Sequence, residues 1–371
     1  MKILVIIGTR PEAIKMAPLI NRLKRVPSIE IKVCNTGQHK HLVIPIFDFF
    51  GIQADFSIDT MIPNQGLHGL TAAIIEKTKP VFDKFQPDYV LVHGDTTTSF
   101  ASALSAFYSG CKVAHVEAGL RTYNKLAPFP EEMNRTLNSQ LADIHFAPTQ
   151  SAAENLGRAG IIKNVLVTGN TVIDALLDAI ELVNENDAEI QYLKQQIDFT
   201  KKIILFTGHR RENFGKGFDD VFSAVKEITE SRDDIMVIYP VHPNPNVKLS
   251  AEKYFEGNNQ VKLIRPLSYG PFVWLMQKCH LILTDSGGIQ EEAPSLGKPV
   301  LVLRELTERP EAVAAGTVIV VGTNQEKIIS CTNRLLDDQS FYKEMTSLVN
   351  PYGDGKASER IIDFFTQIAA I

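Results

Sequence analysis

The sequence has no long apolar run. Met1 is followed by Lys2–Gly8, a short β-branched stretch that ends in Gly-Thr-Arg. This run is too short for a signal peptide or a membrane span, so it predicts a buried strand. We therefore expect a cytoplasmic protein with no membrane partner.

Cysteine is also scarce, and there is no excess of positive charge. A net charge of -5, from 38 basic and 43 acidic residues, gives no basis for nonspecific binding of nucleic acid. The 371 residues include four cysteines, and no pair has the spacing of a zinc knuckle or a redox motif: Cys34, Cys111, Cys279 and Cys331. A disulfide framework is not expected.

Nucleotide and metal motifs of the common kinds are missing as well. The segment Gly8–Lys15 reads Gly-Thr-Arg-Pro-Glu-Ala-Ile-Lys, which is neither Gly-x-Gly-x-x-Gly nor the Gly-Lys-Ser/Thr ending of a P-loop. The histidines lack metal-ligand spacing with nearby carboxylates: His39, His41, His93, His115, His242 and His280. We expect no dinucleotide or other cofactor and no metal.

What the sequence does contain is a repeated pattern of short continuous β-branched runs, each followed by helical spacing. Such runs are typical of parallel strands covered on both faces. In the first half they lie at Lys2–Gly8, Glu30–Cys34, Tyr89–His93, Lys112–Val116, Ile144–Ala147 and Val165–Val167. In the second half they lie at Lys202–Phe206, Ile235–Tyr239, Val261–Ile264, Leu281–Leu283, Val300–Leu303 and Val318–Val321.

Two such series predict an α/β protein with two Rossmann-like parallel-sheet domains. We expect an N-terminal domain at 1–170 and a C-terminal domain at 171–354. A polar segment, Asp178–Thr200, predicts a helix and a linker near the boundary. The apolar pattern of the last residues predicts a helix at about 355–371 that packs back on the first domain.

Polar or glycine-rich clusters follow nearly every predicted strand. In open α/β sheets, ligands bind outside the carboxyl ends of the strands. We therefore predict that the two domains face each other across a cleft lined from both sides. The clusters begin at Gly8, Thr36, Gly94, Glu117, Thr207, Val241 and Asp285.

Three carboxylates of the first half, Asp95, Glu117 and Glu131, follow or closely trail strand ends. Acidic groups beside a phosphate site are electrostatically unfavourable, so a protein that only bound a nucleotide would avoid them. Proton transfer is a reason to keep them, and together they favour acid–base chemistry. His209, which follows a strand-ending glycine, is a candidate donor to a phosphate or a leaving oxygen.

In the second half, Asp285–Gly288 follows a strand and precedes a predicted helix at Ile289–Leu296. Ser286 is a candidate N-cap, and a helix N-terminus with glycines favours a diphosphate. Either Glu291 or Glu292 is a candidate to hydrogen-bond a ribose; otherwise both are carboxylates stabilised by the helix dipole.

Taken together, these clusters resemble one family, the non-hydrolysing bacterial UDP-N-acetylglucosamine 2-epimerases. No single stretch is specific, but the matching stretches occur in order along most of the chain: Gly8–Leu19, Gly94–Thr98, His115–Arg121, Pro128–Arg135, Thr207–Asn213, Asp285–Ala293 and Thr307–Ala312.

The resemblance implies glycosyltransferase-B architecture, a UDP-sugar substrate, no NAD and a homodimer. It also implies reversible inversion at C2, which converts UDP-N-acetylglucosamine (UDP-GlcNAc) to UDP-N-acetylmannosamine (UDP-ManNAc) and supplies units for cell-envelope polysaccharide. The positions that match family residues around the sugar and diphosphate are Arg10, Lys15, Asp95, Glu117, Glu131 and His209. Those that match UDP-binding positions are Phe272, Ser286, Gly287, Gly288, Glu292 and Arg309.

Some members of the family are regulated by a second UDP-GlcNAc. The residues that match this allosteric site are Gln38, Glu132, Arg210 and His242. His41 and Asn64 stand where the family has Gln and Arg, so the sequence leaves the regulation of this chain open.

Simple deprotonation at C2 is not credible, because this carbon is not next to a carbonyl. If UDP leaves first, the sugar becomes oxocarbenium-like and its C2 proton becomes acidic. Proton loss then gives 2-acetamidoglucal, and return of UDP with protonation of the other face gives the epimer. Asp95 and Glu131 are the expected acid–base pair, with Glu117 orienting the sugar or sharing the role.

Three related functions stay open as alternatives. A hydrolysing epimerase releases UDP and free ManNAc, and a related branch epimerises a diacetamido uronic acid UDP-sugar. A glycosyltransferase of the same architecture moves the sugar to an acceptor. A nucleotide-sugar sensor is disfavoured, because binding alone gains nothing from the row of carboxylates.

Overall fold

The chain forms two compact units in a computed structural model that describes residues 1–62, 65–208, 210, 215–242 and 244–369. The first unit comprises Met1–Asp178 and Tyr352–Ile371, and the second comprises Ala179–Pro351. The first unit extends past the predicted boundary at residue 170 because helix α7 (Thr171–Leu182) begins in it. There, the Asp174 carboxylate accepts hydrogen bonds from two backbone amides of the returning C-terminal segment.

Unit 1 is built on a seven-stranded parallel sheet of order β3-β2-β1-β4-β5-β6-β7. Its central strands are almost fully buried and β-branched, as expected for strands covered on both faces. The strands are β1 (Lys2–Ile7), β2 (Glu30–Asn35), β3 (Phe56–Ser57), β4 (Tyr89–His93), β5 (Lys112–Val116), β6 (Ile144–Ala147) and β7 (Val165–Val167).

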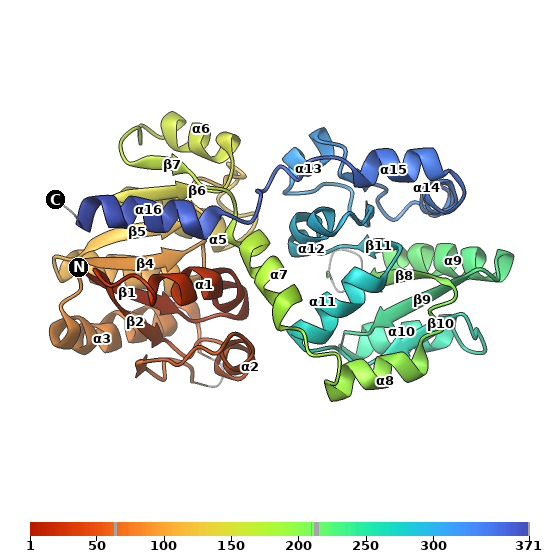
Figure 1. Cartoon of the computed structure of the whole chain (residues 1–371), viewed down its shortest axis with the longest axis horizontal. Coiled ribbons are helices and arrows are strands. Elements are labelled where there is room, and N and C mark those ends of the chain that lie inside the picture. The colour runs from red at the N-terminus through yellow and green to blue at the C-terminus, as the bar shows by residue number, and fades with distance from the viewer. Residues whose placement is uncertain (63–64, 209, 211–214, 243, 370–371) are drawn as a thin grey trace. The chain divides into compact units, whose positions relative to one another are not determined.

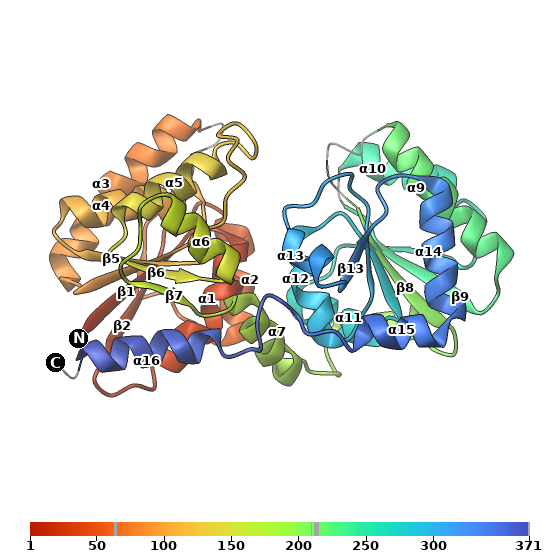
Figure 2. The ribbon, with the colours of Figure 1, turned by 90° about the horizontal axis from the view of Figure 1, so that it is seen from above.

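Helices cover both faces of this sheet (Figures 1 and 2). On one face α1 (Arg10–Leu23) packs against α2 (Lys40–Phe50) and the last helix, α16 (Ala357–Ala369). On the other face α4 (Thr97–Tyr108) packs between α3 (Leu67–Phe85) and α5 (Glu131–Leu141). The remaining helix, α6 (Gln150–Arg158), leads into β7.

The C-terminal helix belongs to the core of unit 1. Phe365 of α16 is fully buried, and its ring makes edge contacts with the rings of Tyr89 in β4 and Phe146 in β6. Phe364 also packs edge-on against Phe146. The helical pattern in the last residues of the sequence therefore reflects a helix that completes one face of the first sheet.

Unit 2 is built on a six-stranded parallel sheet of order β10-β9-β8-β11-β12-β13. The strands are β8 (Lys202–Thr207), β9 (Ile235–Pro240), β10 (Val261–Ile264), β11 (Leu281–Thr284), β12 (Val300–Val302) and β13 (Val318–Val320). The helices are α8 (Ala188–Gln196), α9 (Lys216–Ser231), α10 (Pro245–Tyr254), α11 (Tyr269–Lys278), α12 (Gly287–Glu292), the 3₁₀ helix η2 (Ala293–Leu296), α13 (Pro310–Ala314), α14 (Gln325–Asp337) and α15 (Gln339–Thr346).

The two sheets confirm the predicted fold class of two Rossmann-like α/β domains. All twelve predicted strands are present, with ends within one residue of those expected. One strand was missed: β3 has two residues, lies at the sheet edge and pairs with Cys34 and Asn35. So short a strand leaves no repeating pattern in the sequence. The helix predicted at Ile289–Leu296 is instead two short helices, α12 and η2.

The strand order marks where each sheet can bind a ligand. In unit 1 the connections change direction between β1 and β4, and in unit 2 they change direction between β8 and β11. Ligands of doubly wound sheets bind outside the carboxyl ends of the strands at this switch point. The turns after β1 and β4, and those after β8 and β11, are therefore the candidate ligand-binding turns.

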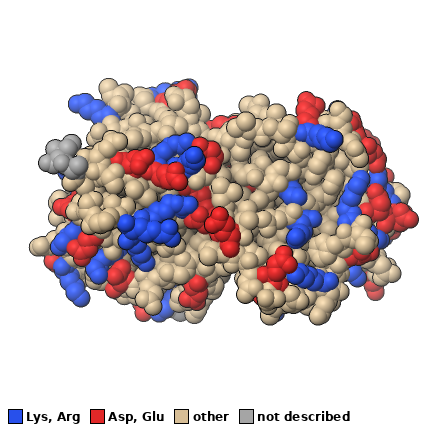
Figure 3. Space-filling view, in the orientation of Figure 1, with Lys and Arg blue, Asp and Glu red and all other residues tan. Residues whose placement is uncertain are grey.

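Charge is distributed in a mixed pattern over the surface. On the face seen in Figure 3, basic and acidic side chains are interspersed over each unit. None of the helices within the described ranges has the length and apolarity needed to cross a membrane.

Candidate active site

The turn between β1 and α1 is tightly packed. A Cβ atom at Gly8 would lie 2.1 Å from Oγ1 of Thr98 and 2.3 Å from Oγ1 of Thr36, so only glycine fits. These two hydroxyl oxygens lie 3.0 Å apart, and the Thr98 hydroxyl donates to Oε1 of Gln38 at 2.7 Å. The carboxyl ends of β1, β2 and β4 are thus connected, and Gln38 is held beside them.

Glu12 joins this turn to the next one. It is fully buried, and its Oε2 accepts hydrogen bonds from the backbone amides of Gly8 (2.9 Å) and Thr9 (2.7 Å) and from the Thr9 hydroxyl (2.9 Å). Its Oε1 accepts from the hydroxyl of Thr96 at 2.5 Å. Burial raises the pKa of Glu12, although these hydrogen bonds act in the opposite direction. Glu12 therefore fixes the β1–α1 turn relative to the turn that carries Asp95.

Two cations predicted to bind substrate lie on α1. Arg10 is half-buried at the start of the helix, and its guanidinium forms no hydrogen bond or ion pair with the described residues. Lys15 is buried, and its Nζ forms an ion pair with Oε2 of Glu117. The same oxygen accepts from Nδ2 of Asn170 at 2.8 Å and lies 3.8 Å from Nε2 of His93.

Glu117 occupies an unusual backbone position. It follows β5 directly and has a φ of 63°, in the left-handed region that few residues other than glycine adopt. Its side chain is only 10% exposed. Together with the contacts to Lys15 and Asn170, this makes Glu117 the most firmly held of the three candidate carboxylates.

Three buried histidines cross the sheet behind these turns. His93 ends β4, His115 lies in β5, and His145 lies beside it in β6. Burial lowers the pKa of His93 to about 4, that of His115 to about 3 and that of His145 to about 4. All three rings are therefore neutral at pH 7, and His115 Nε2 hydrogen-bonds the carbonyl of Gly94 at 2.7 Å.

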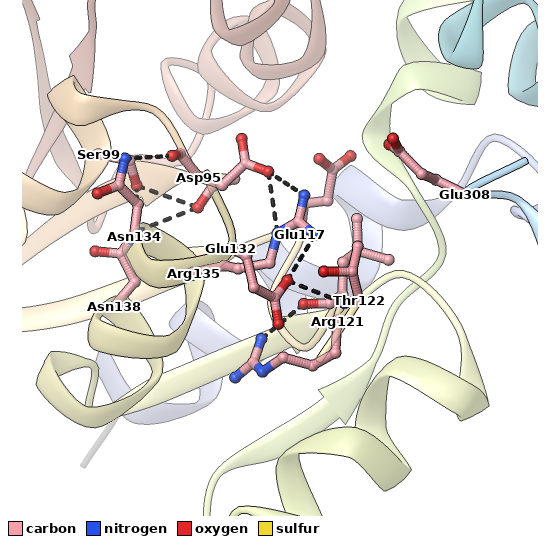
Figure 4. Close-up of polar contacts among 12 residues, drawn as sticks. Asp95, Ser99, Glu117, Arg121, Thr122, Glu132, Asn134, Arg135, Asn138 and Glu308 are labelled. Carbon is pink, nitrogen blue, oxygen red and sulfur yellow. Dashed lines mark hydrogen bonds and ion pairs between the residues drawn. The ribbon is translucent and has the colours of Figure 1, made fainter. Parts of the chain in front are cut away.

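Asp95 lies in the turn after β4 and is paired with an arginine (Figure 4). Oδ2 of Asp95 accepts from Nε of Arg135 at 3.1 Å and from Nη2 at 2.5 Å. The Asp95 side chain is 26% exposed, so it is accessible while it is held.

The first two residues of α5 differ in their surroundings. Glu131 is half-buried, and its side chain makes no hydrogen bond or ion pair within the described part of the chain. Glu132 is buried, and its carboxylate accepts from the backbone amides of Thr122 (2.9 Å) and Tyr123 (3.0 Å) and from Nη1 of Arg135 (3.1 Å). Glu132 thus holds the loop that precedes α5.

In unit 2 the turns after β8 and β11 are also tied together. Oδ2 of the buried Asp285 accepts from the backbone amide of Arg210 at 2.8 Å. Ser286 is the N-cap of α12 as predicted, but its hydroxyl makes no capping hydrogen bond. Ser286, Gly287 and Gly288 are all half-buried. The amides at the start of α12 are thus not capped by the Ser286 side chain.

An arginine from the following loop lies at this turn. A Cβ atom at Gly287 would lie 3.6 Å from Nη2 of Arg309, and Nε of Arg309 forms an ion pair with Oε1 of the buried Glu291. Glu292 is also buried and accepts from the Tyr269 hydroxyl at 3.3 Å. Glu291 therefore orients Arg309 at this turn.

The remaining predicted residues are placed as follows. Phe272 is half-buried on α11, and His242 is exposed, with its Nδ1 accepting from the amide of Asn244 at 3.2 Å. Of the four residues matched to an allosteric site, Gln38 and Glu132 belong to unit 1, and Arg210 and His242 belong to unit 2. His209 lies outside the described residues.

Sequence reasoning missed several residues that build the site. Arg135 lay within a matched stretch but was given no role, although its spacing of four from Glu131 places both on one helix face. Asn170 follows the end of β7, which is a signal that could have singled it out. Glu12 has the capping-box spacing from Thr9, and this spacing is a signal in the sequence that predicts a bond between its carboxylate and the start of the helix. No group of three or more metal-ligating side chains occurs among the described residues.

Comparison with known proteins identifies the family. The family model for UDP-N-acetylglucosamine 2-epimerase matches residues 21–366. The Escherichia coli (strain K12) enzyme of that name is 50% identical over 367 residues, which cover 98% of each chain. The crystal structure of UDP-GlcNAc 2-epimerase from Neisseria meningitidis bound to UDP-GlcNAc is 47% identical, with a TM-score of 0.89 over 99% of this chain and 100% of that one.

A more distant structure gives the same result. The Methanocaldococcus jannaschii UDP-GlcNAc 2-epimerase in complex with UDP-GlcNAc and UDP is 34% identical, with a TM-score of 0.82 over 99% of this chain and 100% of that one. The resemblance inferred from the motifs is confirmed, and the chain belongs to the UDP-N-acetylglucosamine 2-epimerase family.

Proposed function

We propose that this chain is a non-hydrolysing epimerase that interconverts UDP-GlcNAc and UDP-ManNAc. The observation that carries the proposal is the set of three carboxylates, Asp95, Glu117 and Glu131, around the carboxyl ends of the unit 1 sheet. Their surroundings differ, which suits a reaction that needs different groups for proton transfer and for orientation. The enzymes of this family from Escherichia coli and Neisseria meningitidis are named for this activity.

The reaction proceeds by elimination and re-addition. The C1–O bond to UDP breaks, and UDP leaves with the electron pair. A carboxylate takes the C2 proton, and a C1–C2 double bond forms, giving 2-acetamidoglucal. In the second half, a proton is delivered to the other face of C2 and the UDP oxygen attacks C1. No electrons enter or leave, so no redox cofactor is needed.

Within unit 1 the roles follow from the contacts. Asp95 is held but accessible, and Glu131 makes no hydrogen bond or ion pair with the described residues, so we assign proton transfer at the two faces of C2 to this pair. Glu117 has a side chain that is only 10% exposed and is fixed by Lys15 and Asn170, which fits orientation of the sugar.

Within unit 2 the residues suit the leaving group. The turn Ser286–Gly288 opens a helix with half-buried glycines, and Arg309 lies beside it. Backbone amides and a guanidinium stabilise the diphosphate charge that develops as the C1–O bond breaks. Arg10, Lys15 and His209 are the additional cations or donors that we assign to the diphosphate. Phe272 and Glu292 are assigned to the uridine.

Three wider statements complete the proposal. We propose that the chain acts in the cytoplasm, forms a homodimer and supplies ManNAc units for cell-envelope polysaccharide. Each is carried by membership of the family.

The proposal is tested by incubating the chain with UDP-GlcNAc alone in deuterated water. We expect UDP-ManNAc with one deuterium at C2, detected by NMR and mass spectrometry. Product without deuterium would exclude proton removal at C2. Free ManNAc and UDP would indicate the hydrolysing reaction, and no reaction without an acceptor would favour a glycosyltransferase. Turnover of a diacetamido uronic acid UDP-sugar but not of UDP-GlcNAc would reassign the substrate.

The role of Glu131 is tested by Glu131→Gln. We expect turnover and C2 exchange to fall by about a hundredfold or more while UDP still binds, because Glu131 is not among the residues that we assign to UDP. The matched control is Glu154→Gln, which removes an exposed carboxylate from α6 of the same unit and should leave turnover unchanged. Unchanged turnover in Glu131→Gln would remove Glu131 from the mechanism.

A further inference from the structure

One face of α5 carries a polar stripe. Glu131, Asn134, Arg135 and Asn138 follow the spacing i, i+3, i+4 and i+7, so they lie along one side of the helix. Asn134, Arg135 and Asn138 are buried, with exposed fractions of 7%, 8% and 0%. Polar side chains so deeply buried need specific hydrogen-bond partners.

Their partners are concentrated on the turn after β4 (Figure 4). Nδ2 of Asn134 donates to the carbonyl of Asp95 at 2.9 Å, and Nδ2 of Asn138 donates to the carbonyl of Gly94 at 3.2 Å. The Gly94 carbonyl also accepts from the hydroxyl of Ser99. The backbone of the turn is therefore fixed to α5 by hydrogen bonds that do not involve the Asp95 side chain.

Arg135 fixes the side chain. Nε and Nη2 of its guanidinium both donate to Oδ2 of Asp95, and Nη1 donates to Oε2 of Glu132 at 3.1 Å. Glu132 is itself bound to two backbone amides of the preceding loop, so the guanidinium is anchored on both sides. A planar fork shared by two carboxylates has little freedom to rotate.

We propose that Arg135 is a positioning residue for the C2 epimerisation: it holds the Asp95 carboxylate in the orientation for proton transfer, at a fixed distance from Glu131 on the same helix. The inference rests on the proposed function and adds a residue to it. Arg135 acts through Asp95 and needs no contact with the substrate. A misplacement of about 1 Å in a catalytic group lowers rates about a hundredfold, which sets the expected effect.

A purely structural role makes a different prediction. Removing Arg135 leaves two carboxylates short of a partner, so some loss of stability is expected in either case. If the arginine only stabilised the fold, the folded fraction would keep its turnover number. If it positions Asp95, kcat falls in fully folded protein while KM for UDP-GlcNAc is nearly unchanged.

The first test compares Arg135→Met and Arg135→Lys with Arg22→Met. Arg22, in the last turn of α1, forms a bidentate ion pair with Asp178 at 2.8 Å in the same unit, on the face of the sheet opposite α5. We expect Arg135→Met to lower kcat about a hundredfold with KM within threefold, and Arg135→Lys to lower it about tenfold. Arg22→Met should keep the wild-type kcat. Equal kcat values for folded Arg135→Met and wild type would overturn the inference.

The second test uses chemical rescue, which also covers a variant of low stability. Arg135→Ala leaves space for a guanidinium ion, and millimolar guanidinium should raise its C2 exchange at least fivefold without affecting Arg22→Ala. No rescue in folded Arg135→Ala would count against positioning by this cation. A wild-type chain without C2 exchange would instead refute the proposed function, whereas normal exchange in both wild type and Arg135→Met would refute only the role of Arg135.

Discussion

Acid should destabilise unit 1 through its row of buried histidines, and His145 allows the effect to be measured for one group. Burial, reinforced by Arg121, lowers the pKa of His145 to about 4, against a smaller opposing contribution from Asp143. Because the pKa is lower in the folded state, the unfolded chain binds the proton first as the pH falls. The neutral ring therefore supports stability fully above about pH 6.5, and this support is lost progressively down to about pH 4.

The magnitude follows from the two pKa values. Histidine in an unfolded chain titrates near pH 6.5, and each unit of difference corresponds to about 1.4 kcal/mol. A pH of 5.0 lies about 1.5 units below the pKa of the unfolded histidine, while the folded ring is still mostly neutral there, so His145 lowers the free energy of unfolding by about 2 kcal/mol relative to pH 7.5. In His145→Gln this pH-dependent part is absent. The difference in stability between the two proteins should shift by about 2 kcal/mol in favour of the variant.

The assay must report on unit 1. Trp274 is the only tryptophan and lies in unit 2, so its fluorescence follows the other sheet. Hydrogen exchange of the amides in β5 and β6, measured at pH 7.5 and 5.0, reports the opening of the strands that hold the histidines. His68→Gln, at an exposed position on α3, is the control and should show no shift. A constant difference between wild type and His145→Gln across this range would refute the reasoning.

Substitutions at three further positions test individual contacts. Gly119 has a φ of 91°, and a Cβ there would lie 2.1 Å from the carbonyl oxygen of Ala152, so Gly119→Ala should destabilise unit 1 by about 3 kcal/mol in a denaturant titration; a loss below 1 kcal/mol would contradict this packing. Glu12→Ala leaves two backbone amides and two hydroxyls without their acceptor and should lower the free energy of unfolding by about 3 kcal/mol, offset in part by relief of the buried charge. Glu12→Gln, which keeps one acceptor oxygen, should lose less, and equal losses would argue against these hydrogen bonds. Arg309→Lys should weaken UDP binding about tenfold by calorimetry, because the lysine ammonium lacks the planar fork that pairs with Glu291 and holds the other N–H donors in fixed directions; unchanged affinity would remove Arg309 from the UDP site.

The fold was largely predictable because its strands are buried on both faces. Continuous β-branched runs gave the twelve strands nearly to the residue, since a fully covered strand has no room for polar side chains. The edge strand β3 escaped because two residues carry no such pattern. Sequence spacing also could not distinguish the single predicted helix after Asp285 from the short α12 and η2, because η2 begins at the residue directly after α12.

The candidate site was predictable in its charges but not in its pairings. Carboxylates after strand ends identified Asp95 and Glu117, since the carboxyl ends of parallel strands meet at one edge. Which cation holds which carboxylate depends on distances across the fold: Lys15 pairs with Glu117 over 102 positions, and Arg135 pairs with Asp95 over 40. Such pairings leave no local pattern, so the positioning role of Arg135 emerged only from the structure.

The return of the last helix to the first sheet bears on the order in which the chain can fold during synthesis. The strands of unit 1 are made before unit 2, but the face that receives Phe365 stays uncovered until α16, which follows unit 2 along the chain, has been made. Unit 2, by contrast, is contiguous and can close as soon as its own residues are made. Unit 1 is thus made before unit 2 but completed after it, and removal of α16 would expose the core around Phe146 without removing Asp95, Glu117 or Glu131.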